Sequence, residues 1–114
     1  MRNKEAADAI LQEAERRNIA TIGNAKTILS IMPWFIDRVS GVLRHQDMMD
    51  VVDVSKETVE NLLSLLVEIE ALGEHEAGGD FYYTANPYVF MKGRQASKTL
   101  TAFFEDTWWA KESK

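Results

Sequence analysis

The two histidines are the residues best suited to acid–base or metal chemistry, and neither has the neighbours that such chemistry needs. His75 stands between Glu74 and Glu76. Successive side chains of a strand point to opposite faces, so both glutamates would point away from the histidine and a metal cluster is not expected. His45 has no second histidine at ligand spacing. We therefore predict a solvated histidine at position 75 and no catalytic or metal role for either residue.

Sequence motifs that carry chemistry are also missing. The chain has no glycine-rich dinucleotide or phosphate loop, no nucleophile elbow and no His-Glu-x-x-His pair. It has no cysteine, so neither a disulfide nor a thiolate metal site can form. We expect no catalytic centre, no metal and no cofactor in this chain.

Aromatic side chains are the more informative candidates. Trp108 and Trp109 would point about 100° apart on a helix, so one of them should leave the core and meet a partner or a ligand. The alternative is that both fill the end of a small core. A possible ligand pocket would be lined by Trp34, Tyr88, Phe104 and Trp109.

Length and charge set the broad class. The 114 residues suffice for one domain, and 46% hydrophobic with 27% charged residues is a globular composition. With 13 basic and 18 acidic residues, the net charge of −5 disfavours binding to nucleic acid phosphates. The charged N-terminal stretch is not typical of a secretion signal, and the longest apolar run is too short to span a membrane. We expect a soluble, cytoplasmic protein.

Two helices are predicted in the first third of the chain. In the first, residues 3–17, the alanines and Ile10 form one thin apolar stripe. In the second, residues 25–43, apolar side chains cover well over half of the helix circumference, and we expect a kink or break at Pro33. This apolar excess either fills a central core or meets another subunit. The predicted dimer interface consists of Ile10, Ile28, Leu29, Ile31, Met32, Phe35 and Trp108.

The middle of the chain has the layout of a winged helix, that is, a helix-turn-helix followed by a two-stranded hairpin. We predict a short helix over 45–52, an N-cap at Ser55 and an amphipathic helix over 56–72. Gly78-Gly79 then turns into an aromatic strand, 81–84. Helices should follow, one from Pro87 to about residue 91 and one over 96–110.

The predicted fold is therefore mainly α: a winged helix with extra N- and C-terminal helices. A single domain would comprise an N-terminal helical arm (1–22), the helix-turn-helix and wing (25–84) and the C-terminal helices (86–110).

A DNA-binding regulator is the alternative function of such a fold. The helix that would read DNA, 55–72, has one base, Lys56, against four acidic residues, so DNA binding is not favoured. A basic patch would have to be assembled by the fold from Arg38, Arg44, Lys92, Arg94 and Lys98.

Three features carry a family resemblance: the segment from Ser55 to Leu72 with its Leu72-Gly73 step, the glycine hairpin, and the strand end marked by Tyr82 and Thr84. Together they resemble the N-terminal winged-helix dimerisation domain of class I S-adenosylmethionine-dependent O-methyltransferases. Phe90-Met91-Lys92-Gly93 and the helix with Phe103 and Phe104 fit the same family, so the resemblance covers roughly residues 28–109.

This resemblance implies dimerisation and a lid over a substrate pocket, without catalysis by this chain. The family's catalytic domain, with its glycine-rich cofactor loop, has no counterpart here. The implied partner is a second copy of the chain or a methyltransferase catalytic domain.

Overall fold

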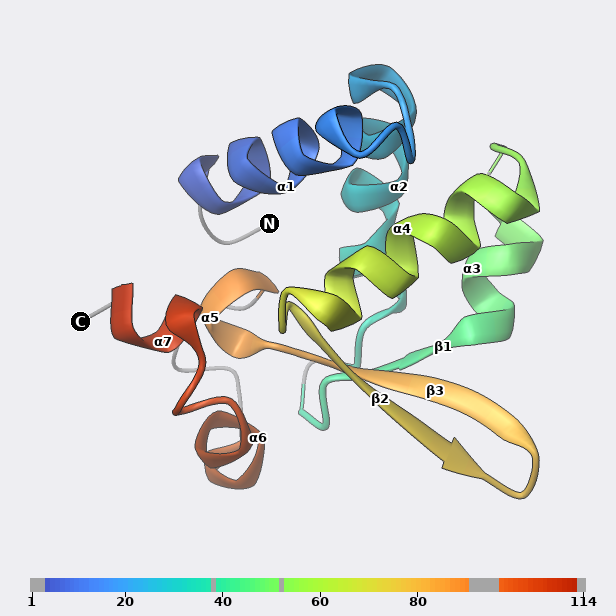
Figure 1. Ribbon diagram of the computed structural model, residues 1–114. Helices are drawn as coiled ribbons and strands as arrows, with labels where there is room; N and C mark the ends of the chain where they lie inside the picture. Colours follow the sequence, from blue (N-terminus) through green and yellow to red (C-terminus); the bar gives the residue numbers. More distant parts are fainter. Residues whose placement is uncertain (1–3, 38, 52, 91–96, 113–114) are drawn as a thin grey trace.

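The computed structural model describes residues 4–37, 39–51, 53–90 and 97–112, which form a mostly helical protein with a small antiparallel sheet (Figure 1). The elements, in chain order, are α1 (Lys4–Arg16), α2 (Ile22–Phe35), β1 (Val42–Arg44), α3 (His45–Val51), α4 (Lys56–Glu68), β2 (Leu72–Ala77), β3 (Asp80–Ala85), α5 (Pro87–Phe90), α6 (Lys98–Phe103) and α7 (Trp108–Glu112). No helix within these ranges has the length and apolar character needed to cross a membrane.

The sheet has the strand order β1-β3-β2, with β3 paired to both neighbours. The predicted hairpin is confirmed: β2 and β3 meet at Gly78 and Gly79, whose φ values of 60° and 88° give the tight turn that side chains disfavour. Strand β1 was not predicted. It joins the sheet by pairing Val42 with Thr84 and Arg44 with Tyr82.

The predicted helix over 25–43 was wrong at both ends. Helix α2 begins at Ile22, because the side chain of Thr21 caps it by accepting a hydrogen bond from the backbone N–H of Asn24. It ends at Phe35, two residues beyond Pro33. The Asp37 carboxylate then accepts hydrogen bonds from two backbone N–H groups, those of residues 39 and 40, which holds a turn into β1.

The short helix α3 and the cap of α4 agree with the sequence. Ser55 Oγ accepts a hydrogen bond from the Thr58 N–H at 3.2 Å, as an N-cap does. Helix α4 ends at Glu68, four residues earlier than predicted. The chain leaves it through Glu70, whose φ is +65°, so that Leu72 already belongs to β2.

The C-terminal region is more broken than predicted. The expected helix over 96–110 is two short helices, α6 and α7, separated by a turn at residues 104–107. Helix α5 begins at Pro87 as predicted, while its predicted end at residues 91–94 lies outside the described residues.

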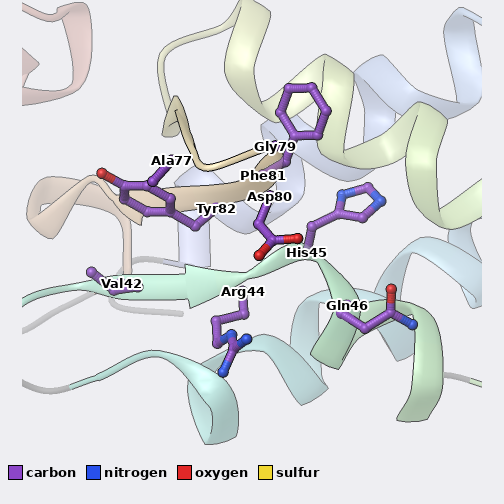
Figure 2. A pocket seen from close by; sticks show the side chains of 9 residues that line it. All are labelled: Val42, Arg44, His45, Gln46, Ala77, Gly79, Asp80, Phe81 and Tyr82. Carbon is purple, nitrogen blue, oxygen red and sulfur yellow. The ribbon is translucent and has the colours of Figure 1, made fainter.

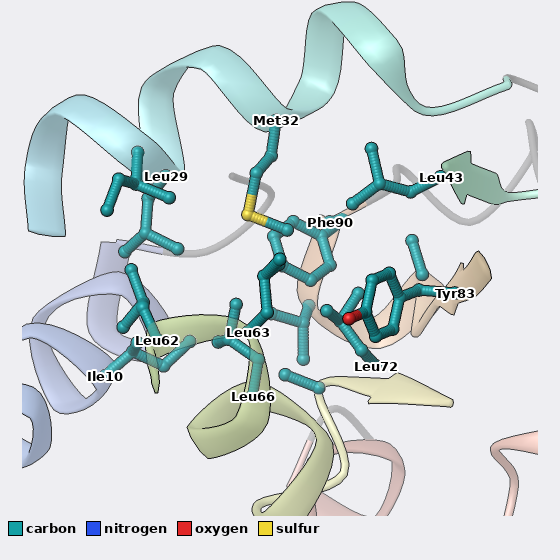
Figure 3. Close-up of a cluster of buried hydrophobic side chains, with 14 of the residues drawn as sticks. Ile10, Leu29, Met32, Leu43, Leu62, Leu63, Leu66, Leu72, Tyr83 and Phe90 are labelled. Carbon is teal, nitrogen blue, oxygen red and sulfur yellow. The ribbon is translucent and has the colours of Figure 1, made fainter. Parts of the chain in front are cut away.

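The core lies between the helices and one face of the sheet (Figure 3). Leu29 and Met32 of α2 project towards the leucines of α4, and Tyr83 closes this space from the sheet. Each fully buried aliphatic or methionine side chain contributes about 1.5–3 kcal/mol relative to its exposed state, so this cluster dominates the stability. The largest fully buried side chains are Ile10, Ile28, Met32, Leu43, Met48, Leu62, Leu63, Leu65, Leu66, Leu72, Val59 and Val89.

Candidate functional site

The face of the sheet turned away from the core carries an aromatic and charged surface. Tyr83 is buried against the helices, so its neighbour Tyr82 must point to the opposite, outer face. Cross-strand partners share a face, which places Arg44 on one side of Tyr82 and His75 on the other. Three strands thus bring a cation, a phenol and an imidazole into one row.

A groove with a volume of about 690 Å³ lies at this end of the sheet, between the start of α3 and the tip of the hairpin, and is lined by residues from both faces of the strands (Figure 2). We call it the sheet groove. Figure 2 shows Arg44 projecting to the opposite side of the strands from His45 and Phe81. The lining residues are Val42, Arg44, His45, Gln46, Ala77, Gly79, Asp80, Phe81 and Tyr82.

His75 is engaged in packing rather than fully solvated as predicted. Its ring stacks on Tyr82, with centroids 5.0 Å apart and planes inclined by 19°, and its Nε2 lies 3.0 Å from the Thr84 hydroxyl. The ring of Phe103, from α6, lies 5.8 Å away on a tilted plane. Within the described residues, no group of three or more potential ligand side chains is placed to hold a metal ion.

His45 belongs to a polar cluster on the core side of the sheet. Its Nδ1 lies 2.8 Å from the Tyr83 hydroxyl, and its Nε2 lies 3.8 Å from a carboxylate oxygen of Glu60. Burial, followed by the charges of Glu74 and Glu60, raises the pKa of Tyr83 to about 12. The phenol therefore stays protonated at neutral pH and serves as a hydrogen-bonding group, not as an activated nucleophile.

A second surface lies on α2. Trp34 is 84% exposed, whereas Ile31 and Phe35 are half-buried. Trp34 and Phe35 follow Ile31 by three and four residues, so the three side chains adjoin on one side of the helix. We call them the α2 patch. An indole this exposed has no packing role in the single chain.

The structure corrects the predicted dimer interface. Ile10, Ile28, Leu29 and Met32 are at most 4% exposed and fill the core of the single chain, because α1 packs against α2 and the side chains of Leu29 and Met32 face those of α4 (Figure 3). They offer no surface to a partner. Of the predicted interface residues, Ile31, Phe35 and Trp108 remain accessible.

The predicted ligand-pocket residues are scattered. Trp34 is exposed on α2, Tyr88 is half-buried, and Phe104 and Trp109 are buried. Trp109 is fixed by an Nε1 hydrogen bond of 2.8 Å to the carbonyl oxygen of Ile69. Its neighbour Trp108 is 58% exposed, so the two tryptophans do separate between core and surface. None of the four predicted residues lines the sheet groove.

The surface formed by α4 and the hairpin is acidic. Between residues 56 and 80, Lys56 is the only basic residue. The exposed side chains of α4 include Glu57, Glu60 and Glu68, and those of the hairpin include Glu74, Glu76 and Asp80. Of the basic residues considered for a DNA-binding patch, Arg44 lies in the sheet groove and Lys98 is exposed at the start of α6, while Arg38, Lys92 and Arg94 lie outside the described residues.

The sheet groove was missed by reasoning from the sequence. Arg44 and Tyr82 are 38 residues apart in numbering and become neighbours only through the β1–β3 pairing. Strand β1 has only three residues, which is too short for an alternation of apolar and polar side chains to indicate a strand.

Comparisons of the chain with protein-family models, with curated proteins and with solved structures give no significant match.

Proposed function

We propose that this chain is a winged-helix association module that forms a homodimer through the α2 patch. In this assignment α3 and α4 are the helix-turn-helix and the β2–β3 hairpin is the wing. The element order α2-β1-α3-α4-β2-β3 and the strand order β1-β3-β2 support it, because a helix-turn-helix followed by a two-stranded wing generates this sequence of elements.

The observation that carries the proposal is the exposure of Trp34 beside Ile31 and Phe35. Tryptophan is enriched among the residues that contribute most to protein interfaces, and an exposed indole flanked by half-buried apolar side chains forms the anchor that such interfaces use. Exposed polar side chains of the same helix, Lys26, Thr27 and Ser30, would form part of the rim.

Charge favours protein association over DNA reading. A recognition helix and wing normally present Arg, Lys, Asn or Gln to the duplex, whereas here the exposed charged side chains of both elements are carboxylates apart from Lys56. Bringing them to a phosphate backbone would place like charges together. The resemblance of the α4–hairpin segment to the dimerisation domain of O-methyltransferases points the same way, and it suggests a lid over the substrate of a catalytic domain as the wider role.

Sedimentation velocity tests the proposal directly. At tens of micromolar, the chain should sediment as a dimer, and Trp34→Ser should weaken the dimer Kd roughly thirtyfold, which corresponds to about 2 kcal/mol for the loss of an interface anchor. Phe81→Ser is the matched control, because Phe81 is also an exposed aromatic residue but lies on the hairpin.

A strict monomer at these concentrations, or an unchanged Kd for Trp34→Ser, would refute dimerisation through the α2 patch. Tight binding of the chain to duplex DNA at physiological salt would instead support the DNA-binding alternative.

A further inference from the structure

The ring of Tyr82 is held in a fixed position with part of its surface available to a ligand. His75 stacks against one side of the phenol and is itself oriented by the Thr84 hydroxyl and packed by Phe103. Tyr82 also lines the sheet groove, so the surface that His75 leaves uncovered borders this space. Aromatic faces held in this way favour another flat ring in an offset stack.

A cation comes from the neighbouring strand, on the same face of the sheet as Tyr82. Arg44 is the direct cross-strand partner of Tyr82, and its side chain is exposed and lines the groove. Guanidinium groups bind carboxylates through two parallel hydrogen bonds, which fixes both the position and the orientation of the bound acid. The strand register therefore sets a stacking surface and an anion-binding group side by side.

We propose that the sheet groove binds a planar aromatic carboxylate, with its ring stacked on Tyr82 and its carboxylate paired with Arg44. The groove volume of about 690 Å³ lies within the range of small-molecule sites. Val42 and Ala77 supply apolar lining, which suits the hydrocarbon edge of such a ring.

Asp80 limits the choice of ligand. It lines the same groove and lies on the same face as Tyr82, two positions along β3. A phosphate monoester, with a charge near −2 at neutral pH, would meet this carboxylate with twice the repulsion of a monoanion. The groove therefore fits one carboxylate group rather than a nucleotide phosphate.

This inference does not depend on the proposed dimerisation, because the sheet groove and the α2 patch share no residue. A monomer or a dimer can bind the ligand through Tyr82 and Arg44. Failure of one proposal leaves the other standing.

An NMR titration of the full-length, ¹⁵N-labelled chain with 2-naphthoate tests the site. We expect saturable shifts confined to amides of β1, β3 and the start of α3, with a Kd of about 1 mM or tighter. Arg44→Gln should weaken binding at least tenfold and Tyr82→Leu severalfold. Their matched controls are Lys111→Gln and Trp108→Leu, which change an exposed base and an exposed aromatic residue of α7 outside the groove and should leave the Kd unchanged.

Two further ligands separate the charge from the ring. Naphthalene-2-carboxamide keeps the ring without the charge, and cyclohexanecarboxylate keeps the charge without the aromatic plane. Both should bind at least tenfold more weakly than 2-naphthoate. Equal affinity for the carboxamide, an unchanged Kd in Arg44→Gln, or unsaturable shifts spread over the whole surface would overturn the proposal. The spectra also report whether each variant is folded, and the exposed Arg44 can be replaced without disturbing the core.

Discussion

Asn86 joins three segments of the chain through one buried side chain. Its Nδ2 donates to the Glu70 carbonyl oxygen at 2.8 Å and lies 3.3 Å from the Thr107 hydroxyl, and its Oδ1 accepts from the Tyr88 N–H at 2.9 Å. The side chain thus holds the exit of α4, the start of α5 and the turn before α7 together. A fully buried amide with these partners is costly to remove, because each group left behind loses its hydrogen bond without gaining water.

Asn86→Ala should therefore destabilise the protein by about 2–3 kcal/mol, measured by urea denaturation at pH 7. Asn61→Ala, on the exposed side of α4, is the matched control and should change stability by less than about 0.5 kcal/mol. A similar, small effect of both substitutions would mean that water replaces the Asn86 side chain and that the three segments are not held by it.

Among the elements, α1 is attached to the rest of the protein by packing and by charge. Ala6, Ile10 and Ala14 are buried against α2 and α4. At the end of the helix, Arg17 pairs with Glu13 at 2.6 Å and with Glu68 of α4 at 2.5 Å. These ion pairs lie at the C-terminal end of α1, where the buried alanines no longer hold the helix to its neighbours.

Glu13 gives this attachment a dependence on pH. Hydrogen bonds from Arg16 and Arg17 lower its pKa from 4.5 to about 2. A carboxylate with a lowered pKa in the folded state contributes stability above its ordinary pKa, and this contribution is lost as the pH falls from about 4.5 towards about 2.

Glu13→Gln should therefore be less stable than the wild type at pH 7, and the difference should shrink between pH 4.5 and pH 2 in urea denaturation curves. Glu15→Gln, at an exposed position of the same helix, is the control and should show no such convergence. A difference between Glu13→Gln and the wild type that stays constant down to pH 2 would contradict the role given to the charge.

The elements also differ in how well the sequence predicted them. Helix α4 was found because its leucines recur every three or four residues and Ser55 caps it, which are local signals. Strand β1 was missed because Leu43 is buried in the sheet just as it would be in the predicted helix, so apolar character alone could not separate the two. Four of the residues assigned to a dimer, Ile10, Ile28, Leu29 and Met32, belong to the core instead, because the extent to which neighbouring elements cover α2 depends on tertiary packing.

At the scale of the whole molecule, the C-terminal helices contact both layers of the fold. Trp109 bonds to the end of α4, and Phe103 packs beside His75 on the outer face of the sheet. Leu100 of α6 reaches the loop before β1, where Gly41 is buried. The segment after β3 thus links the helical layer to the sheet that carries the groove.

The contact between Gly41 and Leu100 predicts a measurable coupling across 59 residues of chain. Gly41 has a φ of +73°, and a Cβ there would lie 2.4 Å from Leu100 Cδ2, so an alanine would be strained in its backbone and would also displace the leucine. Gly41→Ala should cost about 2–4 kcal/mol and Leu100→Ala about 2–3 kcal/mol. In the double variant the steric conflict is gone, while the backbone strain and the loss of the buried leucine side chain remain, so the total loss should fall below the sum of the single losses by at least about 1 kcal/mol. Urea denaturation of the four proteins measures this coupling, and additive losses would show that α6 does not pack on the Gly41 loop in solution.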